Sequence, residues 1–377
     1  MLDHSQEIIK NQKHRIHKCC NYKIPDAENI EIRRDKDRKT AGFGGLMKCG
    51  DVWSCPVCSK KISEGRRVEL SSAVKEAKQR GWRVPMLTLT HSHELSDSLK
   101  ASKAEMLNAY GRLFSGRWWQ EMVDVFGIVG RVRALEITHT KESGWHVHFH
   151  ILLFSDDTDC DVEMMESFFR SRWKAILKRL GGYARHDIGA VVTERENYIA
   201  DYIAKFGKMP SESNPKASAD NDAGTWTESH ELAKQVSKKS RTKDGRTPFQ
   251  LLFDSMNGDK QSRVLYLDYV AAMKGAQQLV WSNSLKKDLL NEDEKTDDEI
   301  AEELDNEVVA TVPIGLFRAM SRVGARGHLL DLAANGHDTE LMDFITYMKD
   351  WSENRLKEKV RKRHANANKH KKRHPKR

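Results

Sequence analysis

The sequence predicts an α+β fold built on a mostly antiparallel β-sheet with helices packed against it. Two observations support this prediction. Strand-like and helix-like segments alternate between about residues 84 and 209, and the two longest strand-like segments are separated only by a short polar turn. Antiparallel neighbours can be joined by such a turn, whereas parallel neighbours need a long crossover. A cysteine-containing region precedes the sheet, and a helical region follows it.

The elements of the central region follow from two periodicities. Segments that are rich in β-branched residues, or that alternate apolar with polar residues, are the expected strands: Val84–Thr90, Val129–Thr140, Trp145–Phe154 and Ile188–Thr193. Segments with apolar residues at helical spacing are the expected helices: 94–126, 160–180 and 194–208. The sequence KESG, between the second and third strands, is typical of a hairpin turn.

Composition divides the chain into seven regions. Glu292 to Glu307 holds ten acids against one Lys, and Arg355 to Arg377 holds twelve Lys or Arg against one Glu, so both are expected to be solvated rather than packed. The expected regions are a basic zinc-ribbon region (1–83), a catalytic domain (84–209), a polar linker (210–245), a helical extension (246–290), an acidic flexible segment (291–312), a helical C-terminal region (313–354) and a disordered basic tail (355–377).

The balance of charge predicts a polyanionic partner. The chain of 377 residues carries a net charge of +9, with 38% hydrophobic and 32% charged residues. Lys and Arg side chains neutralise phosphates and release counterions, which favours DNA as the partner. No run of about 18 apolar residues is present, and the first residues lack the apolar core of a signal peptide. We therefore expect a cytoplasmic protein that does not enter a membrane.

Three histidines alternate along one expected strand. In WHVHFHILLF, His146, His148 and His150 occupy every second position, and alternate side chains of a strand share one face. Packing alone rarely places three imidazoles together, so this face is a candidate metal site. If the hairpin is centred on Glu142, Glu136 lies directly opposite His148 and adds a carboxylate. The alternative is a surface Glu136 paired with a nearby arginine.

A stripe of tyrosines follows on an expected helix. In TERENYIADYIAKFGK, Tyr198, Tyr202 and Lys205 stand at helical spacing i, i+4 and i+7. The apolar stripe of Ile199, Ile203 and Phe206 is the better core face, which leaves the tyrosines on the flank. Tyrosine can act as a covalent nucleophile, and a nearby Lys or metal stabilises phenolate and phosphate charge. The alternative is an aromatic stripe that belongs to the core.

A cysteine cluster near the N-terminus predicts a structural zinc site. The sequence CGDVWSCPVC supplies Cys49, Cys55 and Cys58, and a CPxC turn brings two thiolates onto one ion. The fourth ligand is expected to be Cys20 or Cys19, with His17 behind them. The alternative is a set of reduced cysteines in a cytosolic protein. The cations expected to contact DNA beside this ribbon are Lys60, Lys61, Arg66 and Arg67.

Three short motifs, in this order, resemble those of plasmid and phage rolling-circle replication initiators of the HUH endonuclease superfamily. MLTLT resembles the family's first motif, HFH resembles its HUH metal motif, and YIADYIAK resembles the YxxxYxxK nucleophile helix of two-tyrosine initiators. CGDVWSCPVCSKKI and a segment after the central region resemble the plasmid branch. The resemblance covers residues from about 45 to 290 and implies an HUH, RRM-like sheet.

The resemblance implies a mechanism of strand transfer. His148 and His150, with Glu136 or His146, would hold Mg²⁺ or Mn²⁺ at the scissile phosphate. Tyr202 would attack single-stranded origin DNA, form a 5′-phosphotyrosine and release a 3′-OH primer. Tyr198 would rejoin the strand after one round. The partners implied are origin DNA, a host DNA polymerase and a helicase.

Other functions fit parts of the pattern. An HUH transposase or relaxase would use the same motifs, although no GxxxxGK[ST] sequence indicates a fused helicase. A non-catalytic, zinc-containing DNA-binding regulator would use the basic segments alone. A metal hydrolase of small molecules would explain the histidines and leave the tyrosine stripe unexplained. Metal-dependent cleavage of a single-stranded origin distinguishes the nicking enzymes from the regulator.

Overall fold

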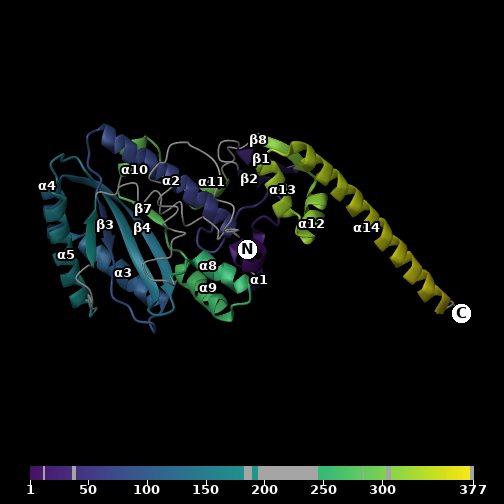
Figure 1. Cartoon of the computed structure of the whole chain (residues 1–377), viewed down its shortest axis with the longest axis horizontal. Coiled ribbons are helices and arrows are strands. Elements are labelled where there is room, and N and C mark those ends of the chain that lie inside the picture. Colours follow the sequence, from purple (N-terminus) through teal and green to yellow (C-terminus); the bar gives the residue numbers. More distant parts are fainter. Residues whose placement is uncertain are drawn as a thin grey trace, which may run out of the picture. The chain divides into compact units, whose positions relative to one another are not determined.

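A computed structural model describes residues 1–11, 13–35, 40–181, 189–193, 245–282, 284–302 and 307–373 (Figure 1). The chain divides into two compact units. Unit 1 comprises Met1–Ile16 and Gly50–Ala301, and unit 2 comprises His17–Cys49 and Glu302–Arg377. Both units combine helices with an antiparallel sheet, so the α+β prediction is confirmed.

Unit 1 is built on a five-stranded antiparallel sheet of order β6-β3-β5-β4-β7. Its strands are β3 (Met86–Leu89), β4 (Ile128–Thr140), β5 (Gly144–Ser155), β6 (Ala190–Thr193) and β7 (Leu279–Trp281). Four of these strands overlap the expected segments. The three residues of β7 lie in a region that was expected to be helical, and they pair with the outer edge of β4.

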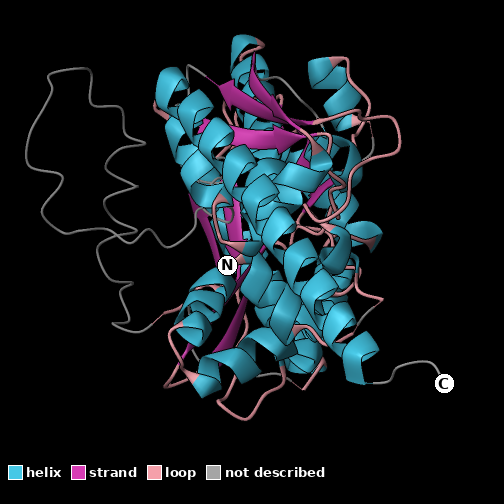
Figure 2. Cartoon of the chain, turned by 90° about the vertical axis from the view of Figure 1, so that its right-hand side faces the viewer, coloured by secondary structure: helices cyan, strands magenta, loops and turns pink. Residues whose placement is uncertain are grey.

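Helices cover both faces of this sheet (Figure 1), and Figure 2 distinguishes the helices and strands of the chain in a second view. The helices α2 (Pro56–Gln79) and α10 (Leu285–Leu290) form a buried core with even-numbered residues of the long strands, including Val132, Ala134 and Leu152. The helices α3 (Leu99–Leu113), α4 (Gly116–Phe126) and α5 (Val162–Arg179) cover the opposite face. Alternation along β4 and β5 therefore separates two sets of side chains.

Local sequence explains where these helices begin and end. The side chains of Ser98 and Asp161 cap the starts of α3 and α5 by accepting hydrogen bonds from backbone N–H groups. One helix was expected over 94–126, but the structure breaks it after Leu113. Ser115 is the N-cap of the next helix, and Gly116 adopts a φ of 75°, which favours glycine.

The rest of unit 1 is helical, as the sequence led us to expect for the region after residue 246. Its elements are α1 (Leu2–Ile8), the 3₁₀ helix η1 (Arg15–Lys18, which runs past the end of the unit), α8 (Pro248–Met256), α9 (Lys260–Met273) and α11 (Asp297–Glu302). Helix α11 lies inside the segment that was expected to be flexible. Its Ile300 and Ala301 are 2% and 1% exposed, so two apolar residues anchor this acidic stretch.

Unit 2 has its own antiparallel sheet, of order β2-β1-β8, with helices beside it. The strands are β1 (Ile30–Asp35), β2 (Thr40–Gly44) and β8 (Glu307–Val312), and the helices are α12 (Ile314–Arg322), α13 (Arg326–Ala334) and α14 (Asp338–Arg373). Buried Arg34 on β1 donates two hydrogen bonds to Asp338, which ties α14 to the sheet. Residues 355–373, expected to be disordered, continue α14.

Among the described residues, none of the helices combines the length and the apolar character needed to cross a membrane. The expected nucleophile helix (194–208) and most of the expected polar linker lie outside the described residues.

Candidate metal centre

The hairpin of β4 and β5 has the register that the sequence analysis assumed. Glu136 is paired with His148, and Thr140 with Gly144, so the turn is centred on Glu142. All the side chains at even positions of this hairpin share a face. After the apolar residues that pack against α2, the polar residues Glu136, His148 and His150 come next on that face.

Glu136, His148 and His150 form a compact group of possible metal ligands. One ligand atom from each lies within 4.8 Å of the others. Glu136 Oε2 is 2.6 Å from His150 Nε2 and 3.9 Å from His148 Nδ1. Glu136 and His148 are partly exposed and His150 is buried, so the group is reached from one side. Two imidazoles and one carboxylate leave several positions of a divalent ion open.

The environment of Glu136 keeps its carboxylate ionised. Burial by itself would raise the pKa of Glu136, because a charged group loses hydration. The interactions of Glu136 with His148 and His150 outweigh burial and hold this pKa well below its usual range. A carboxylate that stays ionised can serve as the anionic ligand of a cation.

The neighbouring strand β3 orients one of these histidines. Thr88 is paired with His150, and its Oγ1 lies 3.2 Å from His150 Nδ1. The other nitrogen, Nε2, then faces Glu136. A hydrogen bond at one nitrogen that leaves the other for a metal is the usual arrangement for a ligating histidine. The Leu- and Thr-rich strand therefore contributes directly to the centre.

His146, the fourth candidate ligand, lies in a different group. Its Nε2 is 3.3 Å from His93 Nε2, 2.9 Å from Ser143 Oγ and 3.2 Å from Thr140 Oγ1. Burial first, and then the neighbouring His93 and His148, lower the pKa of His146 to about 4, so its ring is neutral at pH 7. The structure thus brings together three of the four residues proposed for the catalytic ion.

Two histidines beside this centre were not singled out by the sequence analysis. His91 and His93 follow β3, and their rings lie 6.1 Å apart. Burial, followed by the charges of His93 and His148, lowers the pKa of His91 to about 4. The sequence HSH, just after an expected strand, is the one feature that could have pointed to His91 and His93. These residues lie in a loop, where no periodicity shows which way a side chain points.

The proposed nucleophiles have no described position. Tyr198, Tyr202 and Lys205 lie outside the described residues. Strand β6, which ends at Thr193, immediately precedes this segment and pairs with β3. The chain therefore enters the segment of the tyrosines from the strand next to the one that carries Thr88.

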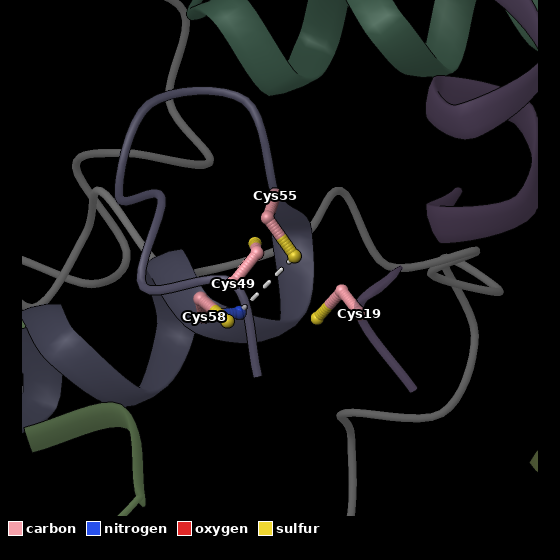
Figure 3. Close-up of side chains that lie close together, drawn as sticks. All are labelled: Cys19, Cys49, Cys55 and Cys58. Carbon is pink, nitrogen blue, oxygen red and sulfur yellow. Dashed lines mark hydrogen bonds between the residues drawn. The ribbon is translucent and has the colours of Figure 1, made fainter. Parts of the chain in front are cut away.

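Four cysteines form the second group of possible metal ligands (Figure 3). The sulfur atoms of Cys19, Cys49, Cys55 and Cys58 all lie within 4.8 Å of one another, and all four residues are buried. Four thiolates satisfy the tetrahedral coordination of a structural zinc ion. Cys19 occupies the position for which Cys20 was the first choice.

The CPxC pair sits on a helix start rather than on an isolated turn. Cys55 is the N-cap of α2, and its sulfur accepts a hydrogen bond from the backbone N–H of Cys58. Pro56 occupies the first helical position, which its fixed φ favours. The Sγ of Cys20 lies 3.6 Å from Lys48 Nζ, and the backbone of Cys20 is left-handed with a φ of 56°. Cys20 is not one of the four, although its Sγ lies 3.9 Å from the Sγ of Cys19.

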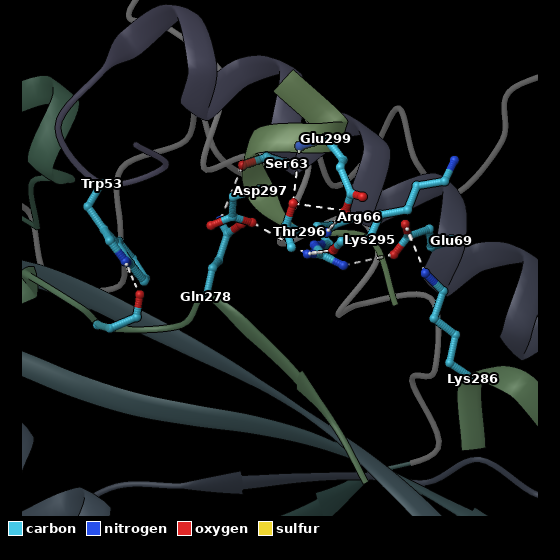
Figure 4. A network of polar contacts seen from close by, with 11 residues as sticks. Trp53, Ser63, Arg66, Glu69, Gln278, Lys286, Lys295, Thr296, Asp297 and Glu299 are labelled. Atoms are coloured by element: carbon cyan, nitrogen blue, oxygen red, sulfur yellow. Dashed lines mark hydrogen bonds and ion pairs between the residues drawn. The ribbon is translucent and has the colours of Figure 1, made fainter. Parts of the chain in front are cut away.

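The basic residues expected to contact DNA beside the cysteines differ in exposure. Arg66 is only 5% exposed and is paired with Glu69 and Asp297, so it is not on the surface as the sequence suggested (Figure 4). Arg67 forms a bidentate pair with Glu64 along α2. Lys60 is exposed, and Lys61 is partly exposed.

A groove of about 940 Å³ opens near the tip of the β4–β5 hairpin. It is lined by residues of the loop before α3, of the start of α3, of α9 and of the hairpin, including Lys100, Lys141 and Trp145. Lys100 and Lys141 are exposed cations. Asp97, Asp259 and Asp268 also line the groove, so its charge is mixed.

A family model described as "Replication protein" matches residues 48–179. This range runs from α2 to α5 and includes Thr88, Glu136, His148 and His150. It stops before the segment of the tyrosines. Comparison with solved structures gives no match for this chain.

Three curated proteins are similar to part of the chain. "Protein rep" of Streptomyces lividans is 30% identical over 219 residues, which cover 44% of this chain and 48% of that protein. "Neomycin resistance protein" of Streptomyces cyanogenus is 32% identical over 133 residues, 29% of this chain and 30% of that protein. "Protein rep" of Lentilactobacillus hilgardii is 32% identical over 128 residues, which cover 32% of this chain and 39% of that protein. The chain thus spans less than half the length of each of these relatives.

Proposed function

Residues 48–179 of this chain belong to the replication-protein family, and from this premise we propose that the chain initiates rolling-circle replication by nicking single-stranded origin DNA. The resemblance to plasmid initiators agrees with the similarity to two proteins named Protein rep. The observation that carries the proposal is the group of Glu136, His148 and His150 on the paired strands β4 and β5.

The donor set fits a divalent ion for phosphate chemistry. One carboxylate and two imidazole nitrogens suit Mn²⁺ better than Mg²⁺, which prefers oxygen ligands. When bound, such an ion would polarise the scissile phosphate and offset negative charge that builds up on it. The residues of this chain hold the ligand atoms in place. Thr88 fixes the ring of His150, and Glu136 stays ionised between the two imidazoles.

The nucleophile in this proposal is Tyr202, with Tyr198 as the second tyrosine and Lys205 beside them. The phenol oxygen of Tyr202 forms a bond to the scissile phosphorus, and the bond to the 3′ oxygen of the preceding nucleotide breaks. The products are a 5′-phosphotyrosine and a free 3′-OH, which primes synthesis by a host polymerase. Because the ester is conserved, Tyr198 can rejoin the strand without ATP.

A transposase or relaxase would share this chemistry. Two of the similar proteins are named Protein rep, which favours an initiator. A structural zinc ion at Cys19, Cys49, Cys55 and Cys58 belongs to the same proposal. It would fix the start of α2, whose apolar face packs on the sheet.

The test is incubation of the full chain with a labelled origin strand and Mn²⁺, followed by mapping of any tyrosine linked to DNA. We expect an adduct at Tyr202 in the wild-type chain and in a Tyr198→Phe variant, and none in a Tyr198→Phe, Tyr202→Phe double variant. Tyr347→Phe, at a tyrosine 62% exposed in α14, is the matched control and should react like the wild type. An adduct that persists in the double variant would refute the proposal.

A further inference from the structure

His93 and His146 form a pair that the proposed reaction does not use. His93 lies in the loop after β3, whereas His146 lies on β5, 53 positions further along the chain. Their Nε2 atoms face each other at 3.3 Å, with ring centroids 4.0 Å apart and ring planes at 72°. Both rings are partly buried, and both belong to unit 1.

Two hydroxyl groups converge on the same point. Ser143 Oγ lies 2.9 Å and Thr140 Oγ1 3.2 Å from His146 Nε2, and the two oxygens are 2.7 Å apart. An imidazole nitrogen carries either one proton or one lone pair, so it makes one good hydrogen bond. Three polar atoms within 3.3 Å of this nitrogen exceed that capacity. A cation among the four atoms would satisfy all of them at once.

The spacing of the two nitrogens matches a shared ion. In a tetrahedral site with metal–nitrogen bonds of about 2.0–2.1 Å, two histidine nitrogens lie about 3.3–3.4 Å apart. We propose that His93 Nε2 and His146 Nε2 bind a second metal ion, of the Zn²⁺ class, with the Ser143 hydroxyl and water completing its coordination. This site is separate from the group of Glu136, His148 and His150.

Two features separate the sites. The ligand atoms of Glu136, His148 and His150 form a group that does not include His146, and the rings of His146 and His148 are centred 6.0 Å apart. Among the described residues, no Asp or Glu forms a group of possible ligands with this pair, although Asp97 acts on His93 through its charge. Imidazole without carboxylate favours Zn²⁺, Ni²⁺ or Cu²⁺ over Mg²⁺ and Ca²⁺, so the two sites select different ions.

The ion would join two segments beside the catalytic centre. His93 belongs to the loop that leads from β3 to α3, and Ser143 and His146 belong to the tip of the β4–β5 hairpin. The same loop and the same tip line the groove near Lys141. A bound ion would therefore hold this loop against the hairpin at one side of the groove.

The experiment uses the full chain with Zn²⁺ retained in its cysteine group and with Glu136→Gln to disable the first site. Titration with Co²⁺, without DNA, is followed by visible absorption, because tetrahedral Co²⁺ absorbs strongly. We expect one equivalent of Co²⁺ to give tetrahedral bands. Adding His93→Gln or His146→Gln should weaken this binding at least about 10-fold. His337→Gln, at an exposed histidine of unit 2, is the matched control and should leave it unchanged.

A measurement without variants guards against misfolding. In the wild-type chain, Zn²⁺ should protect His93 and His146 from acylation by diethyl pyrocarbonate, as mapped by mass spectrometry, while His337 stays reactive. No tetrahedral Co²⁺ signal in the Glu136→Gln chain, or an unchanged signal after His93→Gln, would overturn the proposal. Neither outcome depends on DNA cleavage, so a failed nicking assay would leave this inference intact.

Discussion

At the scale of single residues, the centre depends on one partly buried carboxylate held between two imidazoles. Glu136 lies opposite His148 in the hairpin and 2.6 Å from His150 Nε2. An ionised carboxylate in a buried place is stable only when it is paired and hydrogen-bonded. Both histidines are fixed by strand pairing, and His150 also by Thr88. The ligand atoms are therefore in place before any ion binds.

Replacing Glu136 by Gln should remove metal-dependent cleavage and leave the fold intact. The amide has the shape of the carboxylate but no charge, so the ion loses its one anionic ligand. We expect the rate of Mn²⁺-dependent nicking to fall about 100-fold or more, because a loss of several kcal/mol of charge stabilisation has that effect. Glu142→Gln, at the exposed turn of the same hairpin, is the control. Equal rates for the two variants would contradict a metal role for Glu136.

Buried neutral histidines should make stability depend on pH. Burial lowers the pKa of His91 and of His139 to about 4, against an ordinary value of 6.5. Between pH 6.5 and 4 the unfolded chain binds more protons than the folded chain, so the free energy of unfolding decreases as pH falls through this window. We expect Tm at pH 5 to be lower than at pH 7 by on the order of 5 °C. A His139→Asn variant should show a smaller drop, measured by calorimetry.

The residues of the centre were predictable to the extent that they lie on strands. The alternation of His146, His148 and His150 fixes a shared face, and the short turn fixes the position of Glu136. The same reasoning could not separate His146 from the other two, because that depends on His93. His93 comes from a loop, whose side-chain directions follow no period. The wrong exposure expected for Arg66 has a similar cause, since its partner Asp297 is 231 residues away.

At the scale of elements, α2 connects the sheet to the acidic segment. Its apolar face packs on β4 and β5, and its polar side holds the acidic segment through Arg66 (Figure 4). Arg66 donates a hydrogen bond to the carbonyl of Lys295 and pairs with Asp297. Lys286, which is 3% exposed, pairs with Glu69 at 3.1 Å. Arg66, which was expected to contact DNA, is thus used inside unit 1.

A glycine in α2 allows α11 to approach closely. A Cβ atom on Gly65 would lie 2.6 Å from Ile300 Cγ2, whereas a Cβ on Gly111 in α3 would meet nothing within 4 Å. Replacing Gly by Ala inside a helix ordinarily stabilises by about 0.8–1 kcal/mol. We expect Gly111→Ala to raise the free energy of unfolding by about that amount and Gly65→Ala to lower it, as measured with urea. If α11 did not dock on α2, both variants would be stabilised.

The docking of α11 could not be read from the sequence, because composition dominates this segment. Ten acids in sixteen positions indicate a solvated chain. Two apolar residues, Ile300 and Ala301, and one buried arginine are enough to hold it. The strand β7 was missed for another reason. Three residues are too few to show the alternation of apolar and polar side chains that predicts a strand. Their β structure depends on pairing with the edge of β4.

At the scale of the whole molecule, charge is distributed unevenly along the chain. The net charge is +9, and residues 355–377 contain twelve Lys or Arg. Several basic residues elsewhere are committed to internal pairs, as Arg34 and Arg66 are. By its composition, the segment 355–377 is therefore a candidate for binding a polyanion. Non-specific binding to DNA comes mainly from such charges and weakens with salt.

Removing that charge should weaken DNA binding without changing where DNA is cut. For single strands, the slope of log K against log salt is about −0.7 for each phosphate neutralised. We expect a chain ending at residue 354 to bind any single strand at least about 10-fold more weakly at low salt, with a slope smaller by one or more. The nick position should stay the same, because the centre on β4 and β5 is unchanged. A variant with six of these cations changed to Gln controls for chain length and should show an intermediate slope. An unchanged slope in both would mean that phosphates are bound elsewhere, with the exposed Lys100 and Lys141 as the next candidates.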